Sequence, residues 1–524
     1  MPEHPQIEIN AQFQKALDLM ENTNQHVFIT GKAGTGKSTL LDYFRTITRK
    51  RLAVLAPTGV AALNVYGQTI HSFCGFKPNI SLDKIKKKTS KDGSRTTIYK
   101  NLVTIIIDEI SMVRADLLDC LEKFLRLNGP RPRKPFGGIQ MIFIGDLYQL
   151  PPVVTSAEKT VFSLQYESPY FFSSKIFSKS KFTMDFIELE KIYRQTEEEF
   201  ISLLNGIRNR SVTEEDISRL NRNWVPDFVP QKNDYYIFLT STNDQAFRRN
   251  QEKLGLLPGK SFRFQGFMSG DFDPSALPTE KELEVKPGAQ IMLLNNDTFG
   301  RWVNGSIGKI VGIIPKNGED DVIQVELSDG NIVNVTPFNW EIYKYSYDDR
   351  TQKIFSQPAG SFTQYPLKLA WALTIHKSQG KTFHKVVIDI GRGTFAHGQV
   401  YVALSRCTSL QGIILLKPIQ KRHILMDFRV VQFLTRLQYQ KAEERLSYEN
   451  KVKIILSAIA EKEEVEIVYL KTDDTKSRRR IRPQIIEPME YKGKQFEGLR
   501  AFCHKRRDIR HFRIDRILEL TTNG

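Results

Sequence analysis

The chain has 524 residues, of which 40% are hydrophobic and 26% are charged, and its formal net charge is +17. This balance excludes an intrinsically disordered chain, and the lack of any run of about 18 apolar residues excludes a membrane-spanning helix. The large positive charge favours a polyanionic partner, although a generally solubilising surface would also produce it.

The N-terminal residues are polar and acidic, so we expect no secretory signal. The four cysteines have no metal-ligand spacing, so neither a zinc module nor an iron–sulfur cluster is expected. Free thiols fit a reducing compartment, and we expect the protein in a bacterial-type cytoplasm. The cysteines are Cys74, Cys120, Cys407 and Cys503.

A glycine-rich segment at 31–39 reads G-K-A-G-T-G-K-S-T and follows the apolar run Val27-Phe28-Ile29. Its glycines let the backbone curl so that successive N–H groups point at phosphates, and the helix that follows presents its positive end. Lys37 would reach the terminal phosphates, and the Ser38 hydroxyl would ligate Mg²⁺. The pattern predicts a nucleotide site contacted by Gly34, Thr35, Gly36, Lys37, Ser38 and Thr39.

Short apolar runs alternate with helical patterns along most of the chain, which predicts an α/β fold with parallel sheets covered on both faces. We expect two such domains in tandem. Strands of the first are predicted at 27–30, 52–56, 103–107, 140–144 and 186–189, and strands of the second at 235–239, 291–294, 386–390 and 413–416.

Three segments depart from this alternation. Residues 72–100 form a basic insertion, and residues 299–362 carry short alternating strands with an Asp-Gly turn signal, which predicts a small antiparallel barrel. A polar helical stretch predicts a linker. The predicted domains are 1–190, then 191–298 with 363–430, the inserted barrel 299–362, the linker 431–452 and a separate module at 453–524.

Two further segments supply polar groups at the ends of buried strands, where ligands bind in open α/β sheets. The run I-I-I-D-E ends in Asp108, which would hold Mg²⁺, and Glu109, which would accept a proton from the attacking water. An acid-rich helix N-terminus is the alternative. The segment 143–152 contains Gln149, which can hydrogen-bond the terminal phosphate or that water.

Arg194 and Arg406 are candidates for the positive charge that phosphoryl transfer needs in its transition state. We expect both to lie in the second α/β domain, across a cleft from the phosphate loop, so that closure couples hydrolysis to motion. Most arginines of so basic a chain solubilise its surface, which is the alternative for each.

The order of these motifs resembles superfamily 1 helicases, specifically the class B petite-integration-frequency (Pif) branch, which is related to RecD. The segment 116–122 is similar to the signature segment of that family. The resemblance covers roughly residues 8–425 and rests on residues 31–39, 57–62, 108–109, 145–152, 193–195, 376–380 and 401–406.

The resemblance implies two RecA-like domains and an ATP- and Mg²⁺-dependent motor. It implies 5'-to-3' movement on single-stranded DNA, unwinding of duplexes, forks and G-quadruplexes, and roles in replication, repair, recombination or telomere-type maintenance. It also implies a wedge at 72–100, an Src-homology-three-like barrel at 299–362, and a monomer associated with the nucleoid that binds single strands and junctions.

Several residues receive roles by position. Asn10 and Gln14 lie in the stretch that contacts adenine in that family, and Gly380 is assigned to ATP. Small polar groups and backbone amides after the strands can hold DNA phosphates without reading bases. The predicted DNA contacts are Pro57, Thr58, Gly59, Thr69, His71, His376, Lys377, Ser378 and Gln379.

For two of these residues a role without ligand contact is an open alternative: His71 as a histidine packed in the core and Lys377 as a solvated lysine. Four aromatic residues could stack on bases if they are exposed, although phenylalanines are more often part of the core. These residues are Phe73, Phe76, Tyr365 and Trp302.

The C-terminal module resembles a WYL domain, a small Sm-like β-barrel, with Val468 in place of the tryptophan of its name. Arg513 and Arg516 beside a basic loop at 505–507 favour an accessory site for single-stranded DNA or a nucleotide-like ligand. A charged barrel rim without a ligand is the alternative.

For the whole chain, a DNA helicase is the favoured function. A non-motor ATP switch that binds nucleic acid is a second hypothesis, and a motor that moves on RNA is a third, because phosphate contacts ignore the sugar unless the 2'-hydroxyl is sensed.

Overall fold

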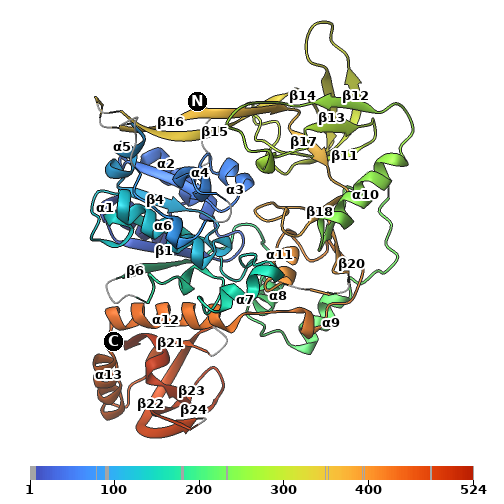
Figure 1. Cartoon of the computed structure of the whole chain (residues 1–524). Helices are drawn as coiled ribbons and strands as arrows, with labels where there is room; N and C mark the ends of the chain where they lie inside the picture. Colours follow the sequence, from blue (N-terminus) through green and yellow to red (C-terminus); the bar gives the residue numbers. More distant parts are fainter. Residues whose placement is uncertain are drawn as a thin grey trace. The chain divides into compact units, whose positions relative to one another are not determined.

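A computed structural model describes residues 8–77, 80–88, 94–178, 182–231, 234–348, 350–351, 353–391, 393–394, 396–471, 475–491 and 493–522. The chain divides into two compact units, one of Met1–Arg208 with Val212–Leu425 and one of Asn209–Ser211 with Met426–Gly524. Figure 1 shows the elements of both units, coloured along the sequence.

The first unit begins with a six-stranded parallel sheet in the order β3-β2-β4-β5-β1-β6, of which Figure 1 labels β1, β4 and β6. Its strands are almost wholly apolar because helices cover both faces, which confirms the predicted fold class. The strands are β1 (His26–Gly31), β2 (Leu52–Ala56), β3 (Gln68–Thr69), β4 (Thr104–Ile107), β5 (Gln140–Ile144) and β6 (Met184–Leu189).

Helix α2 shows how the sequence fixes the packing of this sheet. Leu40, Leu41 and Phe44 share one face of the helix, and all three are buried against the strands together with Phe13 of α1. The helices of this region are α1 (Ala11–Asn22), α2 (Lys37–Ile47), α3 (Gly59–Asn64), α4 (Ile70–Cys74), α5 (Ser94–Asn101), α6 (Ala115–Asn128) and α7 (Ser156–Ser163).

The signature segment 116–122 lies within α6, and its central carboxylate has a structural role. Asp119 is buried and accepts hydrogen bonds from the Tyr166 hydroxyl and the Lys175 backbone N–H, each at 3.0 Å. A buried carboxylate needs such partners, so Asp119 fixes the chain that runs from α7 towards β6.

The second sheet is parallel, with the strand order β18-β7-β19-β20, and Phe238, Ala372 and Val387 belong to its core. Its strands are β7 (Ile237–Thr240), β18 (Ala372–Thr374), β19 (Val386–Asp389) and β20 (Ile413–Leu415). The accompanying helices are α8 (Glu198–Arg208), α9 (Glu214–Asn221), α10 (Asn243–Gly255) and α11 (Gln399–Leu404).

The prediction that the strand at 291–294 belongs to this second parallel sheet is wrong. That segment forms β11, which pairs antiparallel with β12 and β17 in an inserted five-stranded sheet of order β14-β13-β12-β11-β17. A short apolar run does not reveal its partners, so the insertion extends beyond the predicted limits of 299 and 362.

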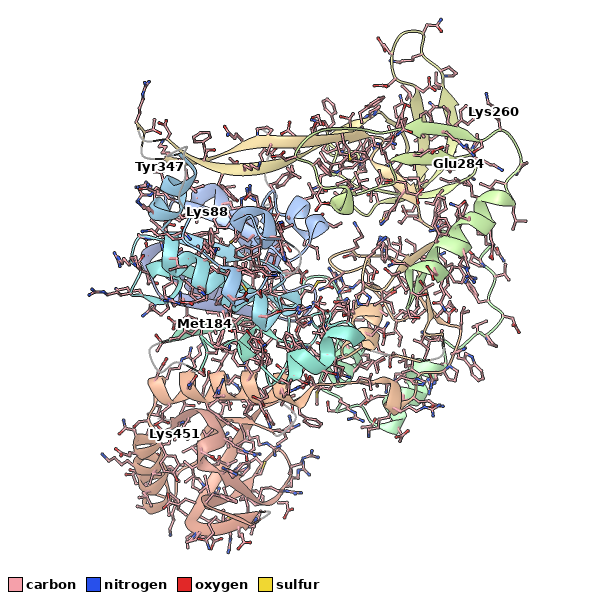
Figure 2. The ribbon with its side chains drawn as sticks, viewed as in Figure 1. Lys88, Met184, Lys260, Glu284, Tyr347 and Lys451 are labelled. Carbon is pink, nitrogen blue, oxygen red and sulfur yellow. The ribbon has the colours of Figure 1, made fainter. Side chains whose placement is uncertain are left out.

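Two smaller antiparallel sheets accompany the inserted one, with the orders β15-β16-β9 and β10-β8, and Figure 2 labels Glu284 in β10. The inserted strands are β8 (Phe262–Gln265), β9 (Phe267–Gly270), β10 (Glu282–Val285), β11 (Gln290–Leu293), β12 (Ile307–Ile314), β13 (Val322–Leu327), β14 (Ile332–Val335), β15 (Phe338–Asp348), β16 (Lys353–Gln364) and β17 (Leu367–Leu369).

The long β15–β16 ribbon reaches the first parallel sheet. The Val54 N–H of β2 donates to the Tyr345 hydroxyl at 2.8 Å, and the Gln68 side chain of β3 donates to the Tyr343 carbonyl. The ribbon therefore satisfies polar groups at the edge of that sheet.

The expectation of exposed aromatic residues is wrong for three of the four. Phe73, Trp302 and Tyr365 are buried, and Phe73 packs edge-on against Tyr99 and Tyr345. These large apolar side chains pack in the core. Residue type alone does not distinguish such a buried aromatic side chain from an exposed one that stacks on bases.

The predicted wedge at 72–100 contains the end of α4, a short helix at Leu82–Lys84 and α5. Its residues 78–79 and 89–93 lie outside the described residues. The other short 3-10 helices are Ile110–Met112, Pro135–Gly138, Phe171–Ser173, Pro274–Ala276, Lys421–His423 and Ile514–Arg516.

The second unit is a five-stranded antiparallel sheet of order β24-β23-β22-β21-β25 with two helices (Figure 1). Its elements are α12 (Phe428–Arg445), α13 (Tyr448–Ala460), β21 (Val465–Leu470), β22 (Lys476–Tyr491), β23 (Lys494–Cys503), β24 (Asp508–Arg513) and β25 (Ile517–Thr522).

The predicted linker at 431–452 is part of this second unit. Ala442 of α12 packs with Leu470 and Leu518, and Ile455 of α13 lies in the core of the unit. The helices are polar on one side only, so their apolar faces cover the sheet. Among the helices of the described residues, none is both long and apolar enough to traverse a bilayer.

Candidate functional site

The phosphate loop lies between β1 and α2, as the sequence predicts. Gly34 and Gly36 have φ of 81° and 83°, a left-handed conformation that glycine adopts without strain. A side chain on Gly31 would meet the Thr35 hydroxyl oxygen at 2.5 Å. The glycines are therefore required by the backbone path and by close packing.

Lys37 occupies the centre of the loop. Its Nζ donates to the carbonyls of Gly31 at 2.7 Å and Lys32 at 3.0 Å. Burial lowers the pKa of Lys37, and the nearby carboxylates of Asp146 and Glu109 oppose that shift. The ammonium thus lies among carboxylates from neighbouring strand ends.

Asp108 and Glu109 follow β4 at the same edge of the sheet. Burial raises the pKa of Asp108 to about 7, and the charge of Glu109 adds to the shift. Burial also raises the pKa of Glu109. Two carboxylates that resist ionisation in this way favour a cation beside them.

The donors at this position fit Mg²⁺. Ser38 is exposed at the start of α2, and Ser38 and Asp108 both offer hard oxygen ligands of the kind Mg²⁺ takes. Within the described part of the chain no group of three or more His, Cys, Asp or Glu side chains could hold a metal alone. Mg²⁺ suits such a site because it commonly takes one or two protein ligands plus phosphate oxygens and water.

Gln149 follows β5 and is buried. Its side-chain amide donates to Asp146 at 3.4 Å, and Asp146 also forms a buried ion pair with Arg208 of α8 at 3.2 Å. The Arg208 guanidinium lies 3.9 Å from the centre of the Tyr148 ring. Burial lowers the pKa of Arg208, but the neighbouring acidic groups, with Asp146 the strongest of them, together outweigh burial and the net shift is upward. Sequence reasoning did not identify Arg208, because no motif surrounds it.

Arg194 lies against the phosphate loop, but it does not come from the far domain as predicted. It follows β6, which pairs parallel with β1 in the first sheet. The Tyr193 N–H donates to the Gly34 carbonyl at 2.8 Å, and a side chain on Gly34 would meet Arg194 Cβ at 2.5 Å. Pairing of β6 at the sheet edge brings this arginine to the loop.

Arg406 reaches the same place from the second parallel-sheet region. It is buried, its Nε donates to the Val402 carbonyl at 3.0 Å, and Arg194 donates to the Ser405 carbonyl at 3.2 Å. Burial, followed by the charge of Arg194, lowers the pKa of Arg406 to about 9. Among the described residues neither arginine forms an ion pair with a carboxylate within 4.0 Å.

The loop at 376–380 contacts the carboxylate of Glu109. Gln379 Nε2 donates to Glu109 Oε2 at 3.1 Å. Ser378 is fully buried and its hydroxyl donates to the Ile375 carbonyl at 2.8 Å, so its predicted role as a DNA contact is wrong. Lys377 and Gly380 are exposed, and burial lowers the pKa of the partly buried His376.

The N-terminal residues assigned to adenine behave differently from one another. Asn10 caps α1 and donates to the Tyr193 hydroxyl at 3.3 Å, beside Gly36. Gln14 is exposed and donates to Asp18 on its own helix. Gln12, which the sequence analysis did not select, exchanges two hydrogen bonds with Glu190.

The predicted DNA contacts of the first sheet lie at two helix starts. Thr58 and Thr69 are the N-caps of α3 and α4 and accept backbone N–H groups there. A side chain on Gly59 would meet Ala276 Cβ at 2.3 Å, so the insertion packs closely on this segment. Pro57 and His71 are partly buried, and burial lowers the pKa of His71. Their DNA contacts stay predictions.

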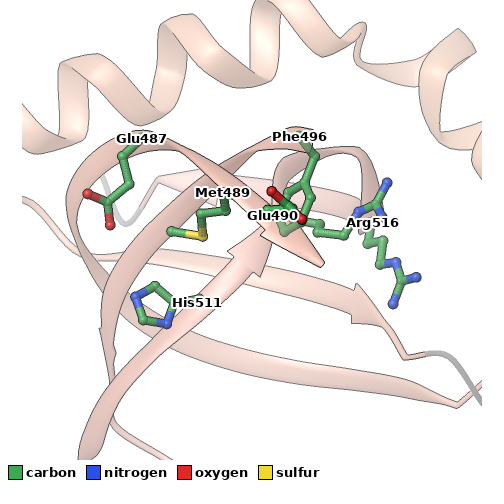
Figure 3. Close-up of a pocket in the computed structure, with 7 residues that line it drawn as sticks. Glu487, Met489, Glu490, Phe496, His511 and Arg516 are labelled. Carbon is green, nitrogen blue, oxygen red and sulfur yellow. The ribbon is translucent and has the colours of Figure 1, made fainter. Parts of the chain in front are cut away.

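The second unit has a cavity of about 510 Å³ between β22, β23 and β24 (Figure 3). Arg513 pairs there with Asp515 and lies 4.7 Å from the centre of the Phe496 ring. The lining residues are Glu487, Met489, Glu490, Phe496, His511, Arg513 and Arg516.

Comparison with known proteins gives two family matches: PIF1-like helicase over residues 7–218 and WYL domain over residues 450–522. The human ATP-dependent DNA helicase PIF1 is 35% identical over 422 residues, which cover 79% of this chain and 62% of that protein. The Bdellovibrio bacteriovorus ATP-dependent DNA helicase Pif1 is 32% identical, over 83% of this chain and 93% of that protein.

A crystal structure of Bacteroides sp. Pif1 in complex with ADP-AlF4 is similar, with a TM-score of 0.75 and 35% identity, and covers 83% of this chain and 98% of that one. The chain therefore spans less than two thirds of the human relative and nearly all of the two bacterial ones.

The raised pKa of Asp108 makes a prediction about stability. The pKa of Asp108 is about 7 in the folded protein and near 3.8 in the unfolded chain. The folded state therefore holds the proton more tightly, and the protein loses stability as pH rises between those two values. Asp108→Asn should therefore raise the melting temperature measured in EDTA without nucleotide, and the gain over the wild type should be larger at pH 8 than at pH 5. Asp18→Asn, on the exposed side of α1, is the control. An equal or lower melting temperature at pH 8 would contradict the assignment.

Proposed function

The chain belongs to the PIF1-like helicase family, and we propose that it is an ATP-dependent DNA helicase. The proposal rests on one observation. Side chains from both parallel-sheet regions, which we call the two lobes, meet at one phosphate loop. Arg194 approaches the loop from the first sheet and Arg406 from the second parallel-sheet region. A site divided between two lobes opens and closes with their motion, as a motor requires.

The residues of the site divide the work of phosphoryl transfer. Lys37 and the loop N–H groups bind the phosphates, and Glu109 accepts the proton of the attacking water. Arg194 and Arg406 stabilise the charge that develops in the transition state. Mg²⁺, held by Ser38 and Asp108, would neutralise phosphate charge and orient the phosphates when bound.

The loop at 376–380 supports coupling of hydrolysis to DNA. Lys377 is exposed and available to a phosphate, whereas Gln379 of the same loop hydrogen-bonds Glu109. A DNA strand that shifts this loop would move the hydrogen bond on the general base. We place DNA phosphates on His376, Lys377, Thr58 and Thr69.

The finer parts of the proposal are 5'-to-3' movement on single-stranded DNA and unwinding of duplex, forked or G-quadruplex substrates by a monomer. They are supported by membership of the family and by the basic net charge of +17. The proposal places the protein with the cytoplasmic DNA of the nucleoid, in replication, repair, recombination or telomere-type maintenance.

Lys37→Ala should abolish ATP hydrolysis, because it removes the ammonium that would meet the terminal phosphates, while DNA affinity changes little. The measurement is phosphate release with and without oligo-dT, together with fluorescence anisotropy of labelled oligo-dT. Lys15→Ala, on the exposed side of α1, is the control. Retained turnover in Lys37→Ala would exclude this loop as the site, and a wild type that oligo-dT does not stimulate would favour the ATP switch.

Strand displacement on tailed duplexes tests the direction of movement and the polymer. We expect unwinding of a duplex with a 5' single-stranded DNA tail and little of one with a 3' tail. The same duplexes with RNA tails are the matched controls, because only the sugar differs. Preference for the 3' tail would overturn the proposed direction, and equal or better unwinding from RNA tails would favour an RNA motor.

For the second unit we propose an accessory site for single-stranded DNA. Lys505, Arg506 and Arg507 are all exposed in the turn that joins β23 to β24, at the opposite end of these strands from Phe496. Unpaired bases can stack on flat groups while lysine and arginine hold the backbone. Phe496, which lines the cavity in Figure 3, offers such a surface, and the Arg513 guanidinium lies over its ring.

Replacing Lys505, Arg506 and Arg507 with serine should weaken oligo-dT binding and lower the slope of log affinity against log salt by about 0.7 for each phosphate that the turn no longer neutralises. Serine at Lys453, Lys462 and Lys471, which are exposed in the same unit, removes the same charge as a control. An identical slope in both triple variants would show that the turn contributes only net charge.

A further inference from the structure

A tyrosine from the second parallel-sheet region forms a hydrogen bond with the phosphate loop itself. The Ala33 N–H donates to the Tyr401 hydroxyl oxygen at 2.9 Å, and Tyr401 is only 4% exposed. Ala33 lies inside the glycine-rich segment whose amides grip phosphate. This hydrogen bond is therefore a direct link from one lobe to the nucleotide-binding backbone of the other.

The same tyrosine lies on the helix that carries Arg406. All residues of α11 are buried, the Ser405 N–H donates to the Tyr401 carbonyl at 2.9 Å, and Arg406 Nε donates to the Val402 carbonyl. The guanidinium is thus tied to the turn of helix in which Tyr401 lies. Movement of that turn moves Arg406 with it.

The start of α11 is packed just as closely. A side chain on Gly398 would meet the Tyr148 carbonyl at 2.2 Å, and Gly398 has a φ of 71°. The helix therefore rests at one end on the segment that carries Gln149. Further along the same helix, Tyr401 joins it to the phosphate loop.

We propose that Tyr401 is a positioning residue, whose hydroxyl fixes α11 on the phosphate loop and thereby places Arg406 at the terminal phosphate. Tyr401 itself contacts the loop backbone. The bond forms only when the two lobes are together, so it orders the arginine in the closed state alone. Reacting groups must be placed closely, and a displacement of about 1 Å can cost on the order of 100-fold in rate.

The inference rests on the proposed hydrolysis of ATP at this site. Tyr401→Phe removes one hydroxyl and keeps the ring. Loss of one hydrogen bond to a buried N–H corresponds to a roughly tenfold change in a rate or binding constant. We expect the DNA-stimulated kcat for ATP to fall about tenfold. The melting temperature should fall no further than in Tyr365→Phe, which also loses one buried hydrogen bond, and the affinity for ADP should stay within about twofold of the wild type, because ADP lacks the phosphate that Arg406 would meet.

Tyr365→Phe is the matched control. Tyr365 is also buried, and its hydroxyl donates to the Asp321 carbonyl inside the inserted sheet at 2.5 Å. Tyr365→Phe should have the same kcat as the wild type. If the wild type itself hydrolyses no ATP, the proposed function fails; if the wild type turns over and Tyr401→Phe equals it, only the inference about Tyr401 fails.

A double-mutant cycle separates positioning of Arg406 from general support of the fold. The readout is binding of ADP with aluminium fluoride, which mimics the transferring phosphoryl group and needs no turnover. Tyr401→Phe should weaken binding of ADP with aluminium fluoride about tenfold when Arg406 is present. It should leave this binding unchanged in the Arg406→Ala background. Equal weakening in both backgrounds would overturn the proposal, because the hydroxyl would then act independently of Arg406.

Tighter binding of ADP by Tyr401→Phe would also overturn it. That result would mean that the hydroxyl competes with phosphate for the Ala33 N–H.

Discussion

The first unit depends on a concentration of charge that is shielded from water at the phosphate loop. Carboxylates from the ends of β4 and β5 face Lys37, and Arg208 balances Asp146 in a buried ion pair. A buried charge is tolerated only when it is paired and hydrogen-bonded. The two arginines nearest the loop lack such pairing among the described residues, and the proposed nucleotide would supply it.

Most contacts that complete the site are made by backbone or by neutral groups. Arg194 and Gln195 both donate to the Ser405 carbonyl, and Tyr401 accepts from Ala33. Such contacts form and break at little electrostatic cost. One ion pair, between Arg208 of α8 and Asp146 after β5, also joins the two parallel-sheet regions and would resist their separation.

The inserted sheets and the second unit have separate hydrophobic cores. Ile291, Val325 and Tyr365 belong to the core of the insertion, and Ile467, Leu499 and Ile514 to the core of the second unit. The insertion and the second unit therefore each fold around their own set of apolar side chains. The β15–β16 ribbon meets the first sheet next to Thr69, where DNA phosphates are proposed.

The sequence by itself determined the first sheet and the chemistry of its strand ends. Buried strands and the phosphate loop follow from local patterns, because apolar runs, glycines and a Lys-Ser pair act within a few residues. Lys37, Asp108, Glu109, Gln149 and Arg406 accordingly lie together as predicted. The family matches confirm the resemblance on which the other assignments rested.

Only the tertiary structure decided which strands pair over long separations and which polar groups meet. The strand at 290–293 joined the insertion, β6 brought Arg194 to the first sheet, and Ser378 became a buried support for its loop. Arg208 and Tyr401 act through partners remote in sequence. Local pattern carries no information about such partners, since pairing depends on the free energy of the whole packed arrangement.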